Sequence, residues 1–283
     1  MNNKEQSKYF LKQLNEFAKT IDKYVSYNNE WTVKGFIDIF KNIYTISDDT
    51  KILSKILEIQ LFPYFLEFAK KNGYRIEPAE HQNWYPDLTF INIDNEELKY
   101  AVDLKTTYKL DDYPGFCNGF TLGSHGEYFS NRNSTKNIQY PYSRYTGHFC
   151  LGIIYSRSII DEEYETCWHE VDALTKIPSV IKDFTFFAVE KWRIASDKRG
   201  SGNTANIGSI KSITDIISGN GTFAKAGEKI FDDYWMNYGK IKVIGKDGKH
   251  KLLTSFDEYI KYRGLSPSII NARAVKSKKG FIE

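Results

Sequence analysis

Cysteine is scarce in this sequence of 283 residues, which contains only three. Cys117, Cys150 and Cys167 form neither a CxxC pair nor a dense framework. This usage is typical of a reducing compartment, so we expect a cytoplasmic protein without disulfides. His148 and Cys150 lie close together in the sequence, as do Cys167 and His169, but the spacing is unlike that of a zinc site. We expect these side chains to be buried for structural reasons.

Long apolar segments and a strong net charge are also absent. No window approaches the roughly 18 uninterrupted apolar residues of a membrane-spanning helix, so we expect no membrane partner. The charged N-terminus MNNKEQSKYFLKQLNEF lacks the apolar core of a signal peptide. The net charge of +3 does not require a polyanionic partner, although a nucleic-acid enzyme can concentrate positive charge locally. No P-loop, HExxH, GxSxG or dinucleotide fingerprint is present.

What the sequence does contain is a mixture of helical and strand patterns. Residues 5–25 carry apolar side chains at helical spacing, and SDDT at 47–50 is typical of an N-cap cluster. The second helix that it opens should be kinked by Pro63 and should end at Asn72-Gly73. A β-hairpin follows, with the strands PDLTFINI and LKYAVDLKTTY joined by a turn at DNEE.

The later segments continue this mixture. Residues 147–157 and 184–196 have the pattern of buried strands, and residues 199–209 form a glycine- and asparagine-rich loop. EKIFDDYWMNYGK and SFDEYIKYRG are predicted helices, and the basic tail 271–283 is expected to be loose. Without repeats or long linkers, the sequence predicts a single domain over residues 1–283. Its expected class is α/β (α+β), with a central mixed sheet flanked by helices.

The strand YAVDL of the hairpin carries an aspartate in an otherwise apolar run. Because alternate residues of a strand face the same side, Asp103 and Lys105 should share one face. If the turn is centred near Asn95, antiparallel pairing places Asp87 almost opposite Asp103. Two carboxylates so close together repel each other, and the arrangement therefore favours a bound cation.

A hard divalent cation is the natural partner of such a pair, and we expect Mg²⁺, with Mn²⁺ as a substitute. This ion polarises a P–O bond and lowers the pKa of a bound water, while Lys105 holds that water or offsets charge on phosphorus. The pattern thus favours phosphodiester hydrolysis. The alternative is a cross-strand charge cluster on a solvated face, because D-x-K is common.

The full pattern, P-D-x(15)-D-x-K, is the signature of the PD-(D/E)xK nucleases. Further segments occur in one order between about residues 31 and 238: SDDTKIL, EIQLFPYFLEFAKKNGYRIE, QNWYPDLTF, AVDLKTTY, FTLG, STKNIQYP, EKWRIASD, GSGNTANIGSI and DYWMNY. In these segments the sequence resembles the EcoRV-type family of type II restriction endonucleases. The first 30 residues resemble the family only loosely, and those after about 239 hardly at all.

The resemblance implies a restriction-endonuclease fold with dimerisation and DNA-binding subregions. It also implies a homodimer that holds duplex DNA in a cleft and cuts both strands with Mg²⁺. By position, Asp87 and Asp103 are the expected metal ligands and Lys105 the catalytic lysine. Glu58 is the expected accessory carboxylate and further ligand. Its alternative interpretation is a helix-surface glutamate.

The same resemblance implies two DNA-contacting loops. GSGNTAN at 200–206 matches the major-groove recognition loop, where glycines allow close approach and Asn203 can pair with adenine. Ala205 replaces the family's threonine and loses its hydroxyl. HQNWYP at 81–86 matches the loop on the minor-groove side. The expected DNA contacts are Gln82, Asn83, Thr106, Thr107, Lys136, Gly200, Ser201, Gly202, Asn203, Thr204, Ala205 and Asn206, with Arg132 as a further candidate.

The sequence therefore predicts a Mg²⁺-dependent type II restriction endonuclease, cutting a palindromic hexamer such as GATATC to leave blunt ends with 5′-phosphates. One alternative is another PD-(D/E)xK nuclease, such as a repair nicking enzyme or a junction resolvase. A second is a DNA-binding module that does not cleave. The intact set of Asp87, Asp103 and Lys105 argues against the second.

Overall fold

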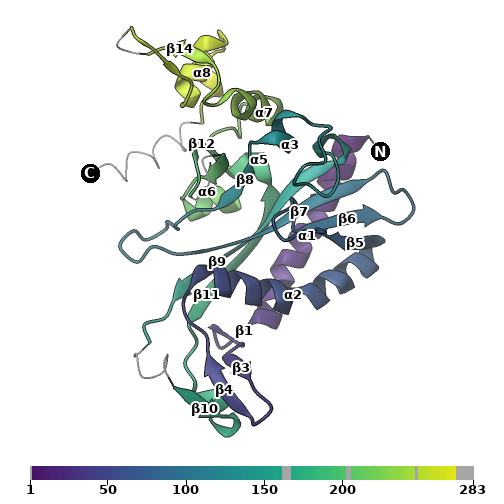
Figure 1. Ribbon diagram of the computed structural model, residues 1–283, viewed down its shortest axis with the longest axis vertical. Coiled ribbons are helices and arrows are strands. Elements are labelled where there is room, and N and C mark those ends of the chain that lie inside the picture. Colours follow the sequence, from purple (N-terminus) through teal and green to yellow (C-terminus); the bar gives the residue numbers. More distant parts are fainter. Residues whose placement is uncertain (1, 161–166, 202–204, 246–247, 272–283) are drawn as a thin grey trace.

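A computed structural model describes residues 2–160, 167–201, 205–245 and 248–271 (Figure 1). Its centre is a seven-stranded sheet, in which β7 and β9 are parallel and the other neighbours are antiparallel. In spatial order the strands are β1 (Ser26–Tyr27), β2 (Glu30–Trp31), β11 (Ile181–Glu190), β9 (Gly147–Arg157), β7 (Lys99–Tyr108), β6 (Leu88–Asn92) and β5 (Tyr74–Pro78). The predicted mixed sheet and its hairpin are therefore confirmed.

Two long helices cover one face of this sheet. Helix α1 (Asn3–Val25) packs on β9 and β11, and α2 (Thr50–Asn72) packs on β5 and β7. The side chain of Asp49 caps α2 by accepting the N–H groups of Lys51 and Ile52. Gly73, with φ of +75°, ends α2 in the left-handed conformation that glycine adopts readily. Both predicted helices are confirmed, and α2 continues through Pro63 as one helix.

The predicted strand over residues 184–196 is only partly right. Strand β11 ends at Glu190, and the chain turns into the short helix α5 (Lys191–Ile194) before β12 (Ala195–Arg199). Glu190 pairs with Phe149, and the partner strand β9 begins only two residues earlier, at Gly147. The ladder therefore runs out at this point, and the chain is free to turn.

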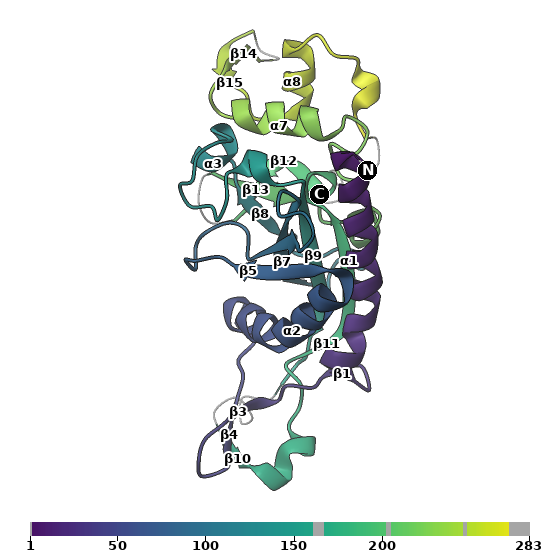
Figure 2. The same cartoon turned by 90° about the vertical axis from the view of Figure 1, so that its right-hand side faces the viewer.

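The opposite face of the sheet is covered by shorter elements. Strands β12 and β13 (Asn206–Ser209) form a small sheet with β8 (Thr121–Ser124), and α3 (Glu127–Ser130) and α6 (Ile213–Ile217) lie nearby. Helix α7 (Glu228–Asn237) leads to a terminal unit of β14 (Lys242–Ile244), β15 (His250–Leu252), α8 (Phe256–Tyr262) and η3 (Pro267–Ile269). Figure 2 shows this unit at one end of the molecule. The expected loose tail lies outside the described residues, apart from Asn271.

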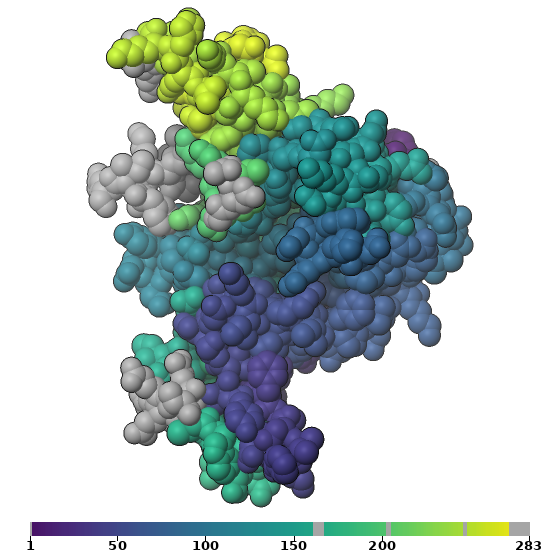
Figure 3. Space-filling view, in the orientation of Figure 1, coloured from purple at the N-terminus to yellow at the C-terminus, as the bar shows by residue number. Residues whose placement is uncertain are grey.

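A second small sheet projects from the other end of the molecule (Figures 1 and 3). It consists of β3 (Gly35–Ile37), β4 (Asn42–Thr45) and β10 (Trp168–Glu170), followed by the 3₁₀ helix η2 (Val171–Lys176). We call these elements the projecting sheet. Cys150 and His148 are buried in β9 as expected. The expected burial of Cys167 is wrong, because this residue directly precedes β10 in the projecting sheet and is exposed. Among the described helices, none has the length and apolar character needed to cross a membrane.

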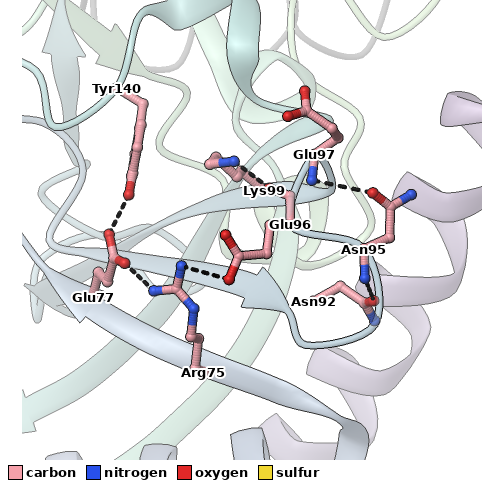
Figure 4. A network of polar contacts seen from close by, with 8 residues as sticks. All are labelled: Arg75, Glu77, Asn92, Asn95, Glu96, Glu97, Lys99 and Tyr140. Atoms are coloured by element: carbon pink, nitrogen blue, oxygen red, sulfur yellow. Dashed lines mark hydrogen bonds and ion pairs between the residues drawn. The ribbon is translucent and has the colours of Figure 1, made fainter.

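A polar network fixes the turn between β6 and β7 (Figure 4). The Asn92 side chain accepts the N–H of Asn95, and the Asn95 side chain accepts the N–H of Glu97. Arg75 on β5 contacts Glu96 in the turn and Glu77 on its own strand, and Glu77 is also contacted by the hydroxyl of Tyr140. These contacts hold the turn in one conformation and thereby support the register of the hairpin.

Candidate active site

The hairpin brings the two predicted carboxylates together. Leu88 pairs with Val102, so Asp87 stands opposite Asp103, as the turn position predicted. The Asp87 N–H donates to Asp103 Oδ1 at 3.3 Å, and the Leu104 N–H donates to Asp87 Oδ2 at 2.8 Å. The backbone of each strand therefore orients the carboxylate of the other.

Lys105 completes the group. Its Nζ lies 3.4 Å from Asp103 Oδ2 and 3.6 Å from Asp87 Oδ2. The Asp103 side chain is only 5% exposed, whereas that of Asp87 is 36% exposed. The Asp103 carboxylate is therefore buried in the sheet, whereas the Asp87 carboxylate is the more accessible of the two.

The charges in this group do not balance. Burial raises the pKa of Asp87, and the carboxylates of Asp103 and Glu58 raise it further, against the opposing effects of Lys105 and the Leu104 N–H. Burial by itself lowers the pKa of Lys105, but Asp103 and Asp87 outweigh it and raise that pKa above its ordinary value. The two carboxylates therefore favour the ammonium form of Lys105. One ammonium faces two carboxylates, so the group is suited to binding a further cation that balances the charge.

Glu58 lies outside the pair. Its carboxylate forms an ion pair with Lys55 at 2.9 Å on the surface of α2. Within the described part of the chain, no three His, Cys, Asp or Glu side chains are grouped closely enough to hold a metal ion. Two carboxylates still fit Mg²⁺, because this ion usually takes one or two from the protein and its other ligands from water and phosphate.

A cleft of about 350 Å³ opens over Asp87, Asp103 and Lys105. Four of the expected DNA-contacting residues line it, namely Gln82, Asn83, Lys136 and Asn206. They come from segments far apart in the sequence, and the fold brings them to one surface. The residues that line the cleft without having been predicted are Trp84, Tyr85, Gly123, Ser124, Glu127, Tyr128 and Asn137.

Other expected contacts lie elsewhere. The Thr106 hydroxyl hydrogen-bonds to that of Ser54 in α2, and Thr107 is only 3% exposed. Arg132 forms an ion pair with Asp232 at 2.8 Å and is not among the residues that line the cleft. Gly202, Asn203 and Thr204 lie outside the described residues.

The base of the 200–206 loop stands on the β12–β13 ribbon. The Gly200 N–H donates to the Asn206 carbonyl at 2.9 Å, and the Asn206 side chain donates to the Ser201 carbonyl at 2.8 Å. Ala205 is held from the side, because its carbonyl accepts the N–H of His125 at 2.8 Å. A β-carbon at Gly208 would lie 2.8 Å from the Lys198 carbonyl oxygen, so glycine is required where the two strands meet.

Several of the missed residues lie in segments that the family resemblance had singled out: Trp84 and Tyr85 in QNWYPDLTF, Gly123 in FTLG and Asn137 in STKNIQYP. The resemblance gave them no role, because they reach the cleft only through long-range folding. Glu127 also lines the cleft, with Asn206 and Lys136.

Comparison with known proteins agrees with this geometry. The family described as "Restriction endonuclease EcoRV" matches residues 27–264. The type II restriction enzyme EcoRV of Escherichia coli is 36% identical over 238 residues, which cover 84% of this chain and 94% of that protein. The match extends past residue 239, further than the sequence motifs indicated. The chain therefore belongs to the EcoRV family of type II restriction endonucleases and is a site-specific deoxyribonuclease.

Proposed function

We propose that the chain is a Mg²⁺-dependent homodimeric endonuclease that cuts a palindromic GATATC-like hexamer at its centre and leaves blunt ends with 5′-phosphates. The main observation in support of this proposal is that Asp87, Asp103 and Lys105 lie together in one cleft. The membership of the chain in the EcoRV family supports the choice of substrate.

Asp87 and Asp103 are the proposed metal ligands. When bound, Mg²⁺ polarises the scissile phosphate and makes a bound water more acidic. The Lys105 ammonium offsets the negative charge that develops on the phosphate oxygens. Water attacks phosphorus in line, the P–O3′ bond breaks, and the departing 3′-oxygen takes up a proton. Glu58 serves as an accessory carboxylate once Lys55 releases it.

The proposed DNA contacts fall into three groups: residues of the cleft wall, the 200–206 loop, and the two threonines that follow Lys105. Lys136 binds a backbone phosphate, and Gln82 and Asn83 approach the minor-groove side from the cleft wall. The 200–206 loop reads base edges in the major groove, where Asn203 can pair with adenine. Thr106 and Thr107 follow Lys105 on β7, and we expect them to reach phosphate and sugar only after a local rearrangement.

Dimerisation through the projecting sheet is the second part of the proposal. The projecting sheet and the strand connections within it carry a set of exposed large apolar side chains, including Ile39 at 90% and Phe40 at 77% exposure: Phe36, Ile37, Ile39, Phe40, Tyr44, Trp168, Val171 and Leu174. Contiguous exposed apolar surface marks an interface. A second copy is the fitting partner, because cutting both strands of a palindrome requires two equivalent sites. We infer that residues 1–283 fold as one domain with this dimerisation subregion and a DNA-binding subregion.

Cleavage mapping tests the activity. A plasmid with one GATATC site is incubated with enzyme and Mg²⁺, and the ends are sequenced. Blunt double-strand cuts at GATATC support the proposal, and cuts at another fixed hexamer would limit it to the endonuclease class. Structure-dependent nicks would favour a repair nuclease or resolvase, and binding without cutting would favour a DNA-binding module.

Replacing Asp103 tests the site itself. Asp103→Ala should lower the cleavage rate by at least about 10³-fold while leaving Ca²⁺-supported duplex binding in place. Asp94→Ala, in the exposed β6–β7 turn, is the matched control and should cleave normally. Undiminished cleavage by Asp103→Ala would rule out the proposed metal site.

Phe40→Glu tests the dimer. Light scattering should show wild type at twice the chain mass and Phe40→Glu at one chain mass, with loss of double-strand cleavage. Ile93→Glu changes an exposed apolar residue in the β6–β7 turn and should remain dimeric. A monomeric wild type that still cuts both strands at once would exclude the proposed dimer.

A further inference from the structure

A buried lysine lies behind the wall of the cleft. Lys191, the first residue of α5, is only 1% exposed, and within the described part of the chain its ammonium has no hydrogen-bond partner. Instead, its Nζ lies 4.3 Å from the ring centroid of Tyr85 and 5.3 Å from that of Tyr142. This is a costly way to bury a charged side chain, because ring faces compensate only part of the lost hydration.

Gly123 is one of the residues that lie between this ammonium and the cleft. Gly123 lines the cleft, and a β-carbon built on it would lie 3.9 Å from Lys191 Nζ and 3.3 Å from Tyr128 Oη. Tyr85 also lines the cleft, and the Lys191 ammonium lies over its ring. In the sequence, Tyr85 precedes Asp87 by two residues. The ammonium is therefore directed toward the wall against which a substrate phosphate would lie.

We propose that Lys191 is a second cationic group of the nuclease site, a positioning residue whose buried ammonium draws the scissile phosphate toward Asp87 and Asp103 through the thin wall at Gly123. This inference rests on the proposed function and adds a residue to it. Lys191 does not touch the phosphate, in contrast to the role proposed for Lys105.

The surroundings of Lys191 favour such a role. Burial lowers its pKa to about 8, with Asp103 and Asp232 opposing that effect and Arg132 and Lys105 adding to it. At pH 7 the side chain therefore still carries its charge. A fixed charge in a protein interior is poorly screened by water and acts over a longer distance than one on the surface.

A structural role would require a different environment. A lysine kept for stability normally ends at a carboxylate or carbonyl oxygen, whereas the Lys191 ammonium lies over two aromatic rings and has no hydrogen-bond partner among the described residues. Replacing an unsatisfied buried charge by an apolar side chain of similar length should stabilise the protein. Function and stability should therefore move in opposite directions on substitution.

The test compares Lys191→Met with wild type, with Lys191→Arg as the charge-conserving variant. Lys12→Met removes an exposed lysine of α1 and is the matched control. Four quantities are measured: the single-turnover cleavage rate, the half-saturating Mg²⁺ concentration, duplex affinity in Ca²⁺, and the Tm of the free protein.

Lys191→Met should cleave roughly tenfold to a hundredfold more slowly, with duplex affinity within about threefold of wild type. Its Tm should be equal or higher, and half-saturation should need less Mg²⁺, because one repelling charge near the metal site is gone. Lys191→Arg should recover part of the rate, and Lys12→Met should match wild type.

Two results would overturn the inference. An unchanged rate in Lys191→Met would show that the charge does not reach the substrate. A parallel fall of rate and Tm, without recovery in Lys191→Arg, would show that Lys191 only supports the fold. Failure of the wild type to cleave any duplex would instead contradict the proposed function.

Discussion

The two faces of the central sheet are built from different kinds of side chain. On the face covered by α1 and α2, Phe10 of α1 is fully buried against the sheet. Its ring stacks on that of Tyr100, with centroids 4.2 Å apart, and also contacts Tyr74 and Phe149. On the cleft face, Asp103, His148 and Lys191 are buried among the aromatic rings. Apolar burial stabilises a fold, whereas buried charge costs free energy. Both faces carry an apolar cluster, but among the described residues only the cleft face also buries charged side chains, and these reduce its net contribution to stability.

The largest expected effect concerns the helix-covered face. Phe10→Ala should lower the free energy of unfolding by about 3–5 kcal/mol, because it leaves a cavity among five aromatic rings. Urea denaturation measures this, and the neighbouring Tyr9→Ala, which changes an exposed ring, should cost less than 1 kcal/mol. The cleavage rate of folded Phe10→Ala should match wild type. A slow but stable Phe10→Ala would contradict the division between the faces.

A smaller effect is expected for the ion pair on the cleft face. Arg132 lies over the rings of Phe129 and Tyr142 and pairs with Asp232, with both side chains largely shielded from water. Arg132→Met should cost about 2 kcal/mol, because it leaves Asp232 without its partner, and Arg132→Met/Asp232→Asn should recover part of that loss. The exposed pair Arg144–Glu97 is the control, and its coupling in the same double-mutant cycle should stay below about 1 kcal/mol. Equal couplings for the two pairs would remove this distinction.

The smallest effect is a dependence of stability on pH. Burial, followed by Lys191 and Arg132, lowers the pKa of His148 well below its ordinary value. The unfolded chain therefore binds this proton at higher pH than the folded chain does. Above the ordinary histidine pKa of about 6.5, both states are unprotonated at this residue and the free energy of unfolding is unaffected by it. As pH falls below that value, the unfolded chain gains the proton first, and the free energy of unfolding drops by at most about 1.4 kcal/mol per pH unit. Denaturation at pH 7.5 and 5.5 should show a smaller loss for His148→Gln than for wild type; equal losses would assign the pH dependence to other groups.

Local patterns predicted the parts of the molecule that local physics determines. The spacing of apolar residues predicted α1, and the cap at Asp49 and the glycine at 73 predicted the two ends of α2. The turn near Asn95 predicted that Asp87 lies opposite Asp103. These features depend on neighbours within about twenty residues.

The remaining features depend on partners far away in the sequence. The helix at 191–194 forms because β9 ends, and the strands of the projecting sheet pair residues 42–44 with residues 168–170. Lys191 of α5 and Gly123 of β8 lie close together only in the folded chain, and no local spacing of residues encodes their approach. The resemblance to a known family identified cleft residues such as Lys136 and Asn206, but it gave no role to Gly123 and Lys191 in the wall behind them.

The parallel pairing of β7 with β9 has a consequence for protein synthesis. The β6–β7 hairpin leaves the ribosome early, but Asp103 pairs with Cys150, and Asn206 also lines the cleft. A nascent chain that stops short of residue 206 therefore carries the acidic pair without Asn206, the last residue in the sequence among those that line the cleft. The order of synthesis thus places completion of the cleft well after that of the hairpin.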